Sequence, residues 1–165
     1  MSFDIALVRV DNRLVHGQIL EAWIPYTEAT CIIIADDNLA GDFFRETVIR
    51  MALPRDIDLY IHTVADFAKS YPFQRNTGEK AIVLFCNIQD ALRSFNLGFH
   101  FESLNIGNVH SDNCAVCCSP SVFLSDEDIG QLSNMTRDLG VRIDIRRVPK
   151  EKSGDIREII RKIPS

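Results

Sequence analysis

Short apolar runs of strand length alternate along this chain with stretches of helical periodicity, and no other feature limits the fold as much. The clearest run, Cys31 to Ala35, is continuously apolar, which is typical of a strand that is covered on both faces. Similar runs predict further strands over residues 5–10, 57–62, 80–86, 104–107, 122–124 and 141–146. The periodic stretches between them predict helices over residues 17–26, 63–71, 87–98, 125–139 and 155–163.

One more helix is predicted after the second strand. Asp36, Asp37 and Asn38 are candidate N-cap residues for it, and it ends before Pro54. Capping explains Asp36 and Asp37 adequately, although a supporting role of Asp36 in a site at the end of this strand stays open. The helix after residue 124 begins with Ser125 to Asp128, which resembles a capping box with Asp at N3. The large apolar residues of the helix before Pro54 are Phe43, Phe44, Val48 and Met51.

This order of elements predicts an α/β fold. Strands that alternate with helices form an open, mostly parallel twisted sheet with helices on both faces, which gives three layers. The chain has 165 residues, 46% of them apolar, so a single domain over residues 1–165 has enough apolar surface for a full core. In such sheets ligands bind where the loops leave the carboxyl ends of the strands. The first of these loops is Asp11 to His16.

Charge and apolar runs exclude several classes of protein. The net charge of -5 argues weakly against nucleic acid as the main partner, since such proteins usually need a basic face. The longest apolar runs are a few residues, so no segment is expected to span a membrane. The first residues, Met1 to Asp4, do not resemble a secretory leader, and a cytoplasmic location is expected. The five cysteines are then expected to be reduced thiols.

The loop after the first strand has the residues that phosphoryl chemistry needs. A neutral imidazole is nucleophilic and can gain or lose a proton readily, so His16 can accept and donate a phosphoryl group. Arg13 offers a permanently charged, bidentate partner for phosphoryl oxygens, and the start of the following helix offers free backbone N–H groups. Asp11 can orient either side chain, and Gly17 lets the backbone approach closely. On these residues alone, a capping or surface histidine and a simple Arg13–Asp11 ion pair stay open.

The motif around this loop resembles a known family. Residues 9–18 read Arg-Val-Asp-Asn-Arg-Leu-Val-His-Gly-Gln, with Trp23 shortly after. This is similar to the signature of the IIB component of the mannose/fructose/sorbose family of the bacterial sugar phosphotransferase system. Residues 32–40 and 51–54 are also similar to runs of that family. The resemblance continues over residues 80–90, 104–108, 122–129 and 141–149, and so covers nearly the whole chain.

The resemblance implies a reaction and its residues. The histidine of such a component takes a phosphoryl group from a phosphohistidine on the EIIA partner and passes it to a sugar at the EIIC/EIID membrane permease. The implied activity is that of a protein-Nπ-phosphohistidine–sugar phosphotransferase, without metal, nucleotide or other cofactor. His16 falls at the phosphohistidine position, with Nδ1 as the implied atom, and Arg13 falls where the phosphoryl oxygens are contacted. The other residues expected to bind the phosphoryl group are Asp11, Asn12, Gly17 and Gln18, and the supporting ones are Arg9, Asp36 and Asn108.

After Asn108 the chain departs from the family pattern. Many members have Arg, Gly-Lys and Gln in this stretch, whereas the run from His110 to Cys118 has thiols and no basic residue. An orphan or regulatory EIIB domain, in which the phosphorylation state of His16 controls a partner instead of sugar uptake, is therefore the alternative function. A metal site is a less favoured reading, because the usual second ligand pair at a distance is missing. Its ligands would be His110, Cys114, Cys117 and Cys118.

Several basic residues gather near the C-terminal end of the chain. They predict a solvated face, and a docking surface for an acidic EIIA is the second reading of them. Neither the identity of the sugar nor the oligomeric state follows from the sequence, and a homo-oligomer stays open. The basic residues are Arg142, Arg146, Arg147, Lys150 and Lys152.

Overall fold

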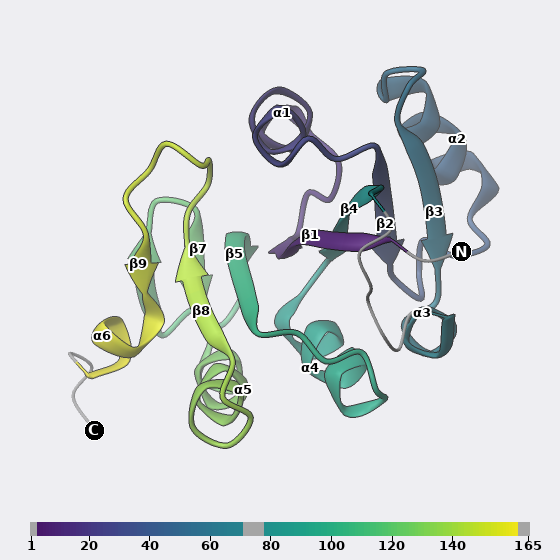
Figure 1. The fold of residues 1–165 in the computed structure, drawn as a ribbon. Coiled ribbons are helices and arrows are strands. Elements are labelled where there is room, and N and C mark those ends of the chain that lie inside the picture. Colours follow the sequence, from purple (N-terminus) through teal and green to yellow (C-terminus); the bar gives the residue numbers. More distant parts are fainter. Residues whose placement is uncertain (1–2, 71–77, 162–165) are drawn as a thin grey trace.

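The computed structural model describes residues 3–70 and 78–161 and arranges them around one sheet of nine strands. The strands are β1 (Asp4–Asp11), β2 (Cys31–Ala35), β3 (Asp58–His62), β4 (Lys80–Phe85), β5 (Ser103–His110), β6 (Val116–Ser119), β7 (Val122–Leu124), β8 (Arg142–Ile145) and β9 (Gly154–Asp155). Their order is β3-β2-β4-β1-β5-β7-β6, while β8 pairs with β5 and β9 pairs with β8 (Figure 1). All pairs are parallel except β6–β7 and β8–β9.

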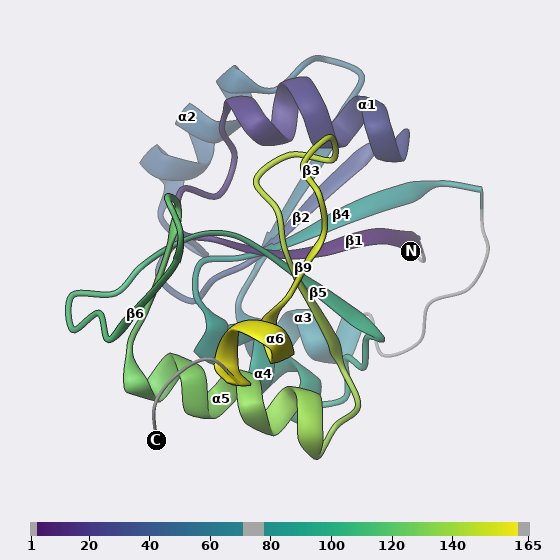
Figure 2. The ribbon, with the colours of Figure 1, turned by 90° about the vertical axis from the view of Figure 1, so that its left-hand side faces the viewer.

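Helices cover both faces of this sheet. They are the π-helix η1 (Gln18–Trp23), α1 (Ile24–Thr27), α2 (Phe43–Ala52), α3 (Val64–Ser70), α4 (Ile88–Asn96), α5 (Asp126–Arg137) and α6 (Ile156–Arg161). Figure 2 shows α1 and α2 on one face and α3, α4 and α5 on the other. The predicted fold class, a mostly parallel open sheet in three layers, is confirmed. No helix in the described ranges is long and apolar enough to cross a membrane.

The central strands are apolar along their whole length because both of their faces are buried. In β4, Val83 and Phe85 point into the cluster under α3, α4 and α5, whereas Ile82 and Leu84 point into the cluster under η1. All four side chains are fully buried. The alternation follows from the two-residue period of a strand. It explains why the continuous apolar runs gave the correct strands, with β2 over the predicted residues.

The start of α2 differs from the prediction. Asp36 does not cap this helix, because its Oδ1 accepts from the backbone N–H groups of Asn38 (2.9 Å) and Leu39 (2.8 Å) and so forms a separate turn. The turn buries Leu39 in the core. The N-cap is Asp42, whose carboxylate accepts from the N–H of Arg45 at 3.1 Å. The segment between β2 and α2 therefore contains the Asp36 turn, the buried Leu39 and the Asp42 cap. The pattern of capping residues alone does not show which Asp begins the helix.

Three further boundaries differ from the prediction. The segment predicted as a loop after residue 107 continues β5 to His110 and then forms β6, which pairs with β7. The helix predicted over residues 17–26 begins as a π-helix and becomes α-helical only at Ile24. In the described residues α3 ends at Ser70 and α6 at Arg161, so the predicted ends at residues 71 and 163 lie outside the described residues.

The topology places the loop after β1 at the point where the strand order reverses. β1 lies between β4 and β5, and the chain leaves β1 toward β2 but later leaves β4 toward β5. The intervening helices α1 and α4 therefore lie on opposite faces of the sheet (Figure 2). The carboxyl ends of these strands, at this switch point, are where such sheets bind ligands.

Candidate functional site

Asp11, the last residue of β1, is the centre of a buried hydrogen-bond network. Its Oδ2 accepts from His16 Nε2 at 2.7 Å, from Arg9 Nη2 at 2.9 Å and from Asn108 Nδ2 at 2.9 Å. Its Oδ1 accepts from the backbone N–H of Arg13 at 2.9 Å. The side chain of Asp11 is fully buried. A buried carboxylate is stable only when its lone pairs are satisfied, and these four donors satisfy them.

The donors keep Asp11 ionised. Burial raises the pKa of this carboxyl group, but the hydrogen bond from His16, the charge of Arg9 and the amide of Asn108 outweigh burial. The net result is a pKa below the ordinary value of 3.8. Burial also lowers the pKa of Arg9, an effect that the nearby Asp11 opposes. At neutral pH, Asp11 is therefore a pure acceptor.

The charge on Asp11 determines the tautomer of His16. An ionised carboxylate can only accept, so the ring nitrogen beside it, Nε2, must carry the proton. In the neutral imidazole the lone pair then lies on Nδ1. Nδ1 is buried and has no hydrogen-bond partner among the described residues. The nucleophilic atom is thus defined by its neighbour, and it is unpaired.

Arg9 fixes the position of the Asp11 carboxylate. Its guanidinium group is fully buried and donates to Asp11 through Nε (3.1 Å) and Nη2 (2.9 Å). Nη1 donates to Oδ1 of Asn105 at 2.7 Å and to the carbonyl oxygen of Arg146 at 3.0 Å. Nη2 also reaches Oε1 of Gln18 at 3.0 Å. The guanidinium group is held on three sides, so Nε and Nη2 donate to the same oxygen, Oδ2 of Asp11, in one geometry.

Gly107 and Trp23 restrict the position of the Arg9 guanidinium group. A Cβ atom at Gly107 would lie 2.0 Å from Cζ and Nη2 of Arg9. The ring of Trp23 has the guanidinium carbons of Arg9 and Arg146 at 5.5 and 5.6 Å from its centroid, which is within the range of cation–π contacts. Its indole N–H donates to the carbonyl oxygen of Arg147 at 2.8 Å. These contacts of Trp23 with Arg146 and Arg147 hold the loop after β8 against the site.

The backbone after Asp11 forms a surface that suits an anion. Leu14 is a buried, non-glycine residue with φ of 55°, which turns the loop sharply. Within the part of the chain that the structure describes, the next N–H groups, of Val15, His16 and Gly17, donate to no acceptor. Consecutive free N–H groups around a left-handed residue make an anion-binding concavity. Arg13 is exposed, and its side chain forms no ion pair with the described residues.

The other predicted site residues divide into two groups. Gln18 and Asn108 belong to the buried network, since Oε1 of Gln18 accepts from Arg9 and, at 3.0 Å, from Nδ2 of Asn108. Their side chains brace Asp11 and Arg9. Asn12 is exposed and its N–H donates to the carbonyl oxygen of Asn108 at 2.9 Å. A Cβ at Gly17 would meet nothing within 4 Å, so this position is open. The Asp36 carboxylate accepts from the backbone of its own turn and, among the described residues, makes no hydrogen bond with the network.

Three residues of the network were not identified from the sequence. Asn105 and Arg146 lie 96 and 137 positions from Arg9 along the chain, so no local pattern connects them with it. Gly107 gave the better signal, because a glycine inside a strand often marks a close approach by another group. Here that group is the Arg9 guanidinium.

The cysteine-rich hairpin has no arrangement typical of a metal centre. The thiols of Cys114 and Cys117 donate to the carbonyl oxygens of Val116 and Ser119. The ring of His110 packs on Phe123 with centroids 4.7 Å apart. In the described residues no group of three or more His, Cys, Asp or Glu side chains could hold a metal ion. Burial, followed by the two neighbouring thiols, raises the pKa of Cys118 to about 11, so this thiol is protonated.

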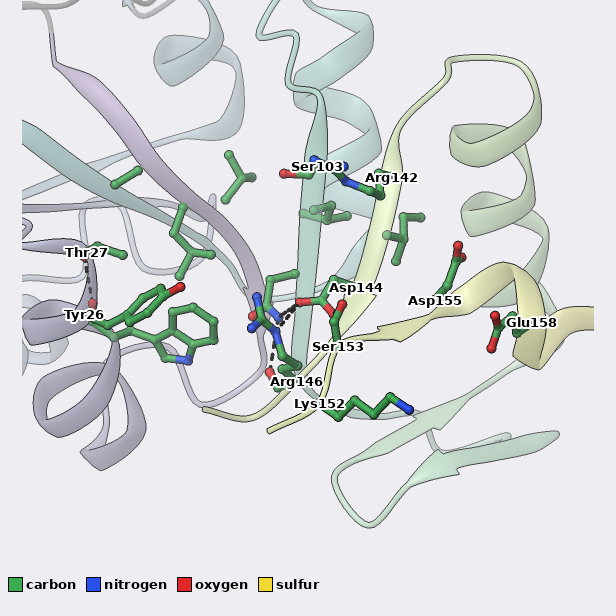
Figure 3. Close-up of a pocket in the computed structure, with 17 residues that line it drawn as sticks. Tyr26, Thr27, Ser103, Arg142, Asp144, Arg146, Lys152, Ser153, Asp155 and Glu158 are labelled. Atoms are coloured by element: carbon green, nitrogen blue, oxygen red, sulfur yellow. Dashed lines mark hydrogen bonds and ion pairs between the residues drawn. The ribbon is translucent and has the colours of Figure 1, made fainter. Parts of the chain in front are cut away.

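A separate cavity of about 560 Å³ is lined by Trp23 and by residues of β1, β5 and β8, among others (Figure 3). Its lining includes Tyr26, Ser103 and Arg142, but neither Asp11 nor His16. Two of its charged side chains already pair, since Arg146 Nε donates to Asp144 at 2.7 Å. The cavity is lined by neither Asp11 nor the residues that donate to it, so the candidate site is the His16 loop.

The fold and the site define an open α/β protein with an oriented histidine at the strand switch point. Comparison with known proteins identifies the family. The sequence model of the PTS system sorbose subfamily IIB component matches residues 5–164. The chain belongs to this family, whose members are phosphotransferase-system components of sugar transport.

Relatives of known sequence and structure agree with this assignment. The chain is similar to the fructose-specific EIIB component of Bacillus subtilis, at 31% identity over 97% of this chain and 98% of that protein. It is 26% identical to the mannose-specific EIIAB component of Escherichia coli over 96% of this chain and 49% of that protein, so it spans about half of that relative. The crystal structure of the IIB domain of the sorbose permease from Klebsiella pneumoniae has a TM-score of 0.87, with 28% identity over 98% and 99% of the two chains.

Proposed function

We propose that His16 is the phosphoryl carrier of this EIIB component. In this reaction it accepts the group from a phosphohistidine of an EIIA partner and passes it to a sugar at an EIIC/EIID permease. The observation that carries the proposal is the 2.7 Å hydrogen bond between Asp11 and Nε2, which keeps the lone pair on Nδ1. The proposed action is on the cytoplasmic side of the membrane, by one domain formed by residues 1–165.

The transfer needs no external proton in its first step. The Nδ1 lone pair of His16 attacks phosphorus, the N–P bond to the donor histidine breaks, and that imidazole recovers its lone pair. The Nε2 proton stays on the hydrogen bond to Asp11, whose negative charge stabilises the positive charge that develops on the ring. Free N–H groups of Val15 and Gly17 and the guanidinium of Arg13 complement the charge on the phosphoryl oxygens.

The second step reverses this bond exchange toward a sugar. A sugar hydroxyl oxygen attacks phosphorus, the Nδ1–P bond breaks, and the hydroxyl proton goes to a base on the acceptor side. Nδ1 of His16 is buried in the unphosphorylated structure, so the groups that cover it have to move aside before the first step, while Nε2 keeps its hydrogen bond to Asp11. Burying a polar atom without a partner is unfavourable, which favours this opening when an anion binds.

Phosphorylation with purified components tests the proposal. The protein is incubated with labelled phosphoenolpyruvate, enzyme I, HPr and a cognate EIIA, and we expect acid-labile, base-stable label on wild type. His16→Ala loses the label, whereas the matched control His110→Ala keeps it because His110 packs on Phe123 in the hairpin. NMR of the ¹⁵N-labelled ring is expected to place phosphorus on Nδ1. Equal labelling of wild type and His16→Ala contradicts the proposal.

The hairpin supports a second candidate function. Residues 109–124 contain no Lys or Arg, and Cys114 and Cys117 are exposed there, in a stretch where many family members are basic. A regulatory EIIB domain would still accept the phosphoryl group at His16 but would use it to control a partner. Membrane vesicles containing the EIIC/EIID proteins distinguish the two. Loss of label from His16 to added sugar supports transport, and label that stays on His16 supports regulation.

A further inference from the structure

Helix α2 has its apolar residues on the outside. Of the six large apolar residues that are exposed in the described chain, four lie on this helix: Phe43 (82% exposed), Phe44 (76%), Val48 (52%) and Met51 (81%). The other two, Tyr26 (65%) and Leu97 (52%), lie on different helices or their ends. Contiguous exposed apolar residues on a protein surface mark an interaction site, whereas single ones do not.

The apolar residues of α2 are exposed although the helix is firmly packed on the sheet. Its opposite face packs on the sheet through Ile49, followed by Leu53 just after the helix, both in the cluster that contains Ile32 and Ile34. Arg50 Nη1 donates to the carbonyl oxygen of Leu59 at 3.2 Å. At 100° per residue, the four exposed side chains fall on one side and the packed ones on the other. The exposed apolar side is therefore a fixed feature of the folded helix. We call its four residues, Phe43, Phe44, Val48 and Met51, the α2 patch.

The α2 patch adjoins the histidine loop. Leu14 of that loop and Leu39 of the segment before α2 belong to one buried cluster. Cys86, at the end of β4, has its thiol 3.9 Å from the carbonyl oxygen of Asn12. Burial raises the pKa of the Cys86 thiol, and the charge of Arg45, in the first turn of α2, lies close enough to oppose this. Figure 2 shows α2 and the loop from β1 to α1 on the same face of the sheet.

Arginines surround the α2 patch. Arg45, Arg50 and Arg55 are exposed, and none of them forms an ion pair within the described ranges. Asp42 is occupied as the N-cap and Glu46 is half-buried. Residues 42–56 hold three arginines and three carboxylates, Asp42, Glu46 and Asp56, so this segment has no net charge in a chain that carries -5 overall. Aromatic residues, Met and Arg are also the types that are enriched at the centres of protein interfaces.

We propose that the α2 patch and its three arginines form the docking surface for the phosphoryl-donor protein, which presents an apolar patch bordered by carboxylates. The inference rests on the proposed function. A donor must bring its phosphohistidine into contact with His16, so it covers the surface beside this loop, and a typical interface buries about 800 Å² on each partner.

Donor titration with a surface variant tests the inference. The triple variant Phe43→Gln, Phe44→Gln, Met51→Gln removes exposed side chains only, so circular dichroism and the melting temperature are expected to match wild type. In single-turnover transfer from phosphorylated EIIA, we expect KM for the donor to rise about tenfold, the cost of one lost interface anchor, with the maximal rate unchanged. The matched control Tyr26→Gln, Leu97→Gln changes the two exposed apolar residues elsewhere and leaves KM unchanged.

A small donor separates this inference from the proposed function. Phosphoramidate, a small molecule with an N–P bond, needs no docking surface, so it should label the triple variant and wild type at equal rates. If neither EIIA nor phosphoramidate labels His16 of wild type, the proposed function fails. If EIIA labels the triple variant with KM raised less than fivefold, the docking inference fails while the proposed function stands. The inference also fails if the triple variant loses self-association or binding to anionic lipid vesicles that wild type has, with donor KM unchanged.

Discussion

At the residue scale, Asp11 decides which nitrogen of His16 is nucleophilic, and Asp11→Asn tests this. An asparagine would turn an N–H donor toward Arg9 or Asn108, both of which are donors themselves. The amide cannot satisfy all of them, so the imidazole loses its fixed orientation. We expect the rate of transfer to His16 to fall between about 10- and 100-fold, as for other groups that orient a reactive histidine. Single-turnover labelling measures the rate, and ¹⁵N NMR measures the tautomer.

The control for this substitution is Asp36→Asn. Asp36 is also buried at the end of a strand, but its carboxylate accepts only from backbone N–H groups of its own turn. We expect the transfer rate of Asp36→Asn to stay within about twofold of wild type because, in the described chain, Asp36 makes no hydrogen bond with the network that orients the His16 ring. Unchanged transfer and an unchanged tautomer in Asp11→Asn would show that the buried network does not orient His16.

Gly107→Ala is the second prediction at this scale. The added methyl group would overlap the Arg9 guanidinium, which has no free direction to move because it is bonded to Asn105 and Asp11. Overpacking of a buried site typically destabilises by about 1–3 kcal/mol, and we expect the upper part of this range. Urea unfolding measures the change in the free energy of unfolding.

The matched control is Gly130→Ala in α5, where a Cβ meets nothing within 4 Å. Replacing this helical glycine is expected to stabilise the protein by about 0.5–1 kcal/mol. The two substitutions add the same methyl group, so opposite signs isolate the effect of the site. If Gly107→Ala is as stable as wild type, Arg9 is less constrained than its contacts indicate.

At the scale of the elements, the N-terminus of α5 is held by a capping box. Ser125 Oγ accepts from the N–H of Asp128 at 3.1 Å, and the Asp128 carboxylate accepts from the N–H of Ser125 at 2.9 Å. We expect Ser125→Ala to lower the free energy of unfolding by about 1 kcal/mol, since one helix N–H loses its acceptor. Ser133→Ala, in the middle of α5, is the control and is expected to cost nothing. Equal urea midpoints for the two variants would contradict the cap.

The same helix shows why some elements were predictable from the sequence. The Ser125 to Asp128 pattern acts over four residues, so the cap and the start of α5 were predicted correctly. The strand β2 was predicted without error because burial on both faces requires a continuous apolar run. The orientation of α2 was not predictable, because Phe43 and Met51 have helical spacing whichever side faces solvent. Apolar periodicity indicates a helix, but only the tertiary structure decides which face is covered.

The candidate site was predictable to the same extent. Residues 9–18 are local in sequence, and the structure gathers Arg9, Asp11, His16 and Gln18 in one network. The partners that complete the network, Asn105 and Arg146, come from β5 and from the loop after β8. These contacts are made by the order of parallel strands, and a single sequence gives no register between distant strands.

At the scale of the whole molecule, the network ties the two halves of the sheet together. β1 pairs with β4 over most of its length but with β5 only from Arg9 onward. At that point the side chain of Arg9 connects β1 with Asn105 on β5 and with the carbonyl oxygen of Arg146 after β8. The charge pair of Arg9 and Asp11 is fully buried in this junction. Its protonation state therefore affects the stability of the fold as well as the chemistry of the site.

The last prediction is the acid stability of the fold. The pKa of Asp11 is lower in the folded protein than its ordinary value of 3.8, so the unfolded chain binds more protons than the folded chain just below that pH. The stabilisation from Asp11 is complete above about pH 4 and is lost as the pH falls through the folded pKa. We expect Asp11→Asn to lower the free energy of unfolding by about 3 kcal/mol at pH 7, because it leaves the buried charge of Arg9 unpaired.

Urea unfolding of both proteins should show this difference shrinking between pH 4 and pH 2. The control is Asp155→Asn, which removes a partly exposed partner of Arg157 and should change the dependence of stability on pH little. A difference between wild type and Asp11→Asn that stays constant from pH 7 to pH 2 would show that folding does not lower the pKa of Asp11, and the network would then not stabilise its charge.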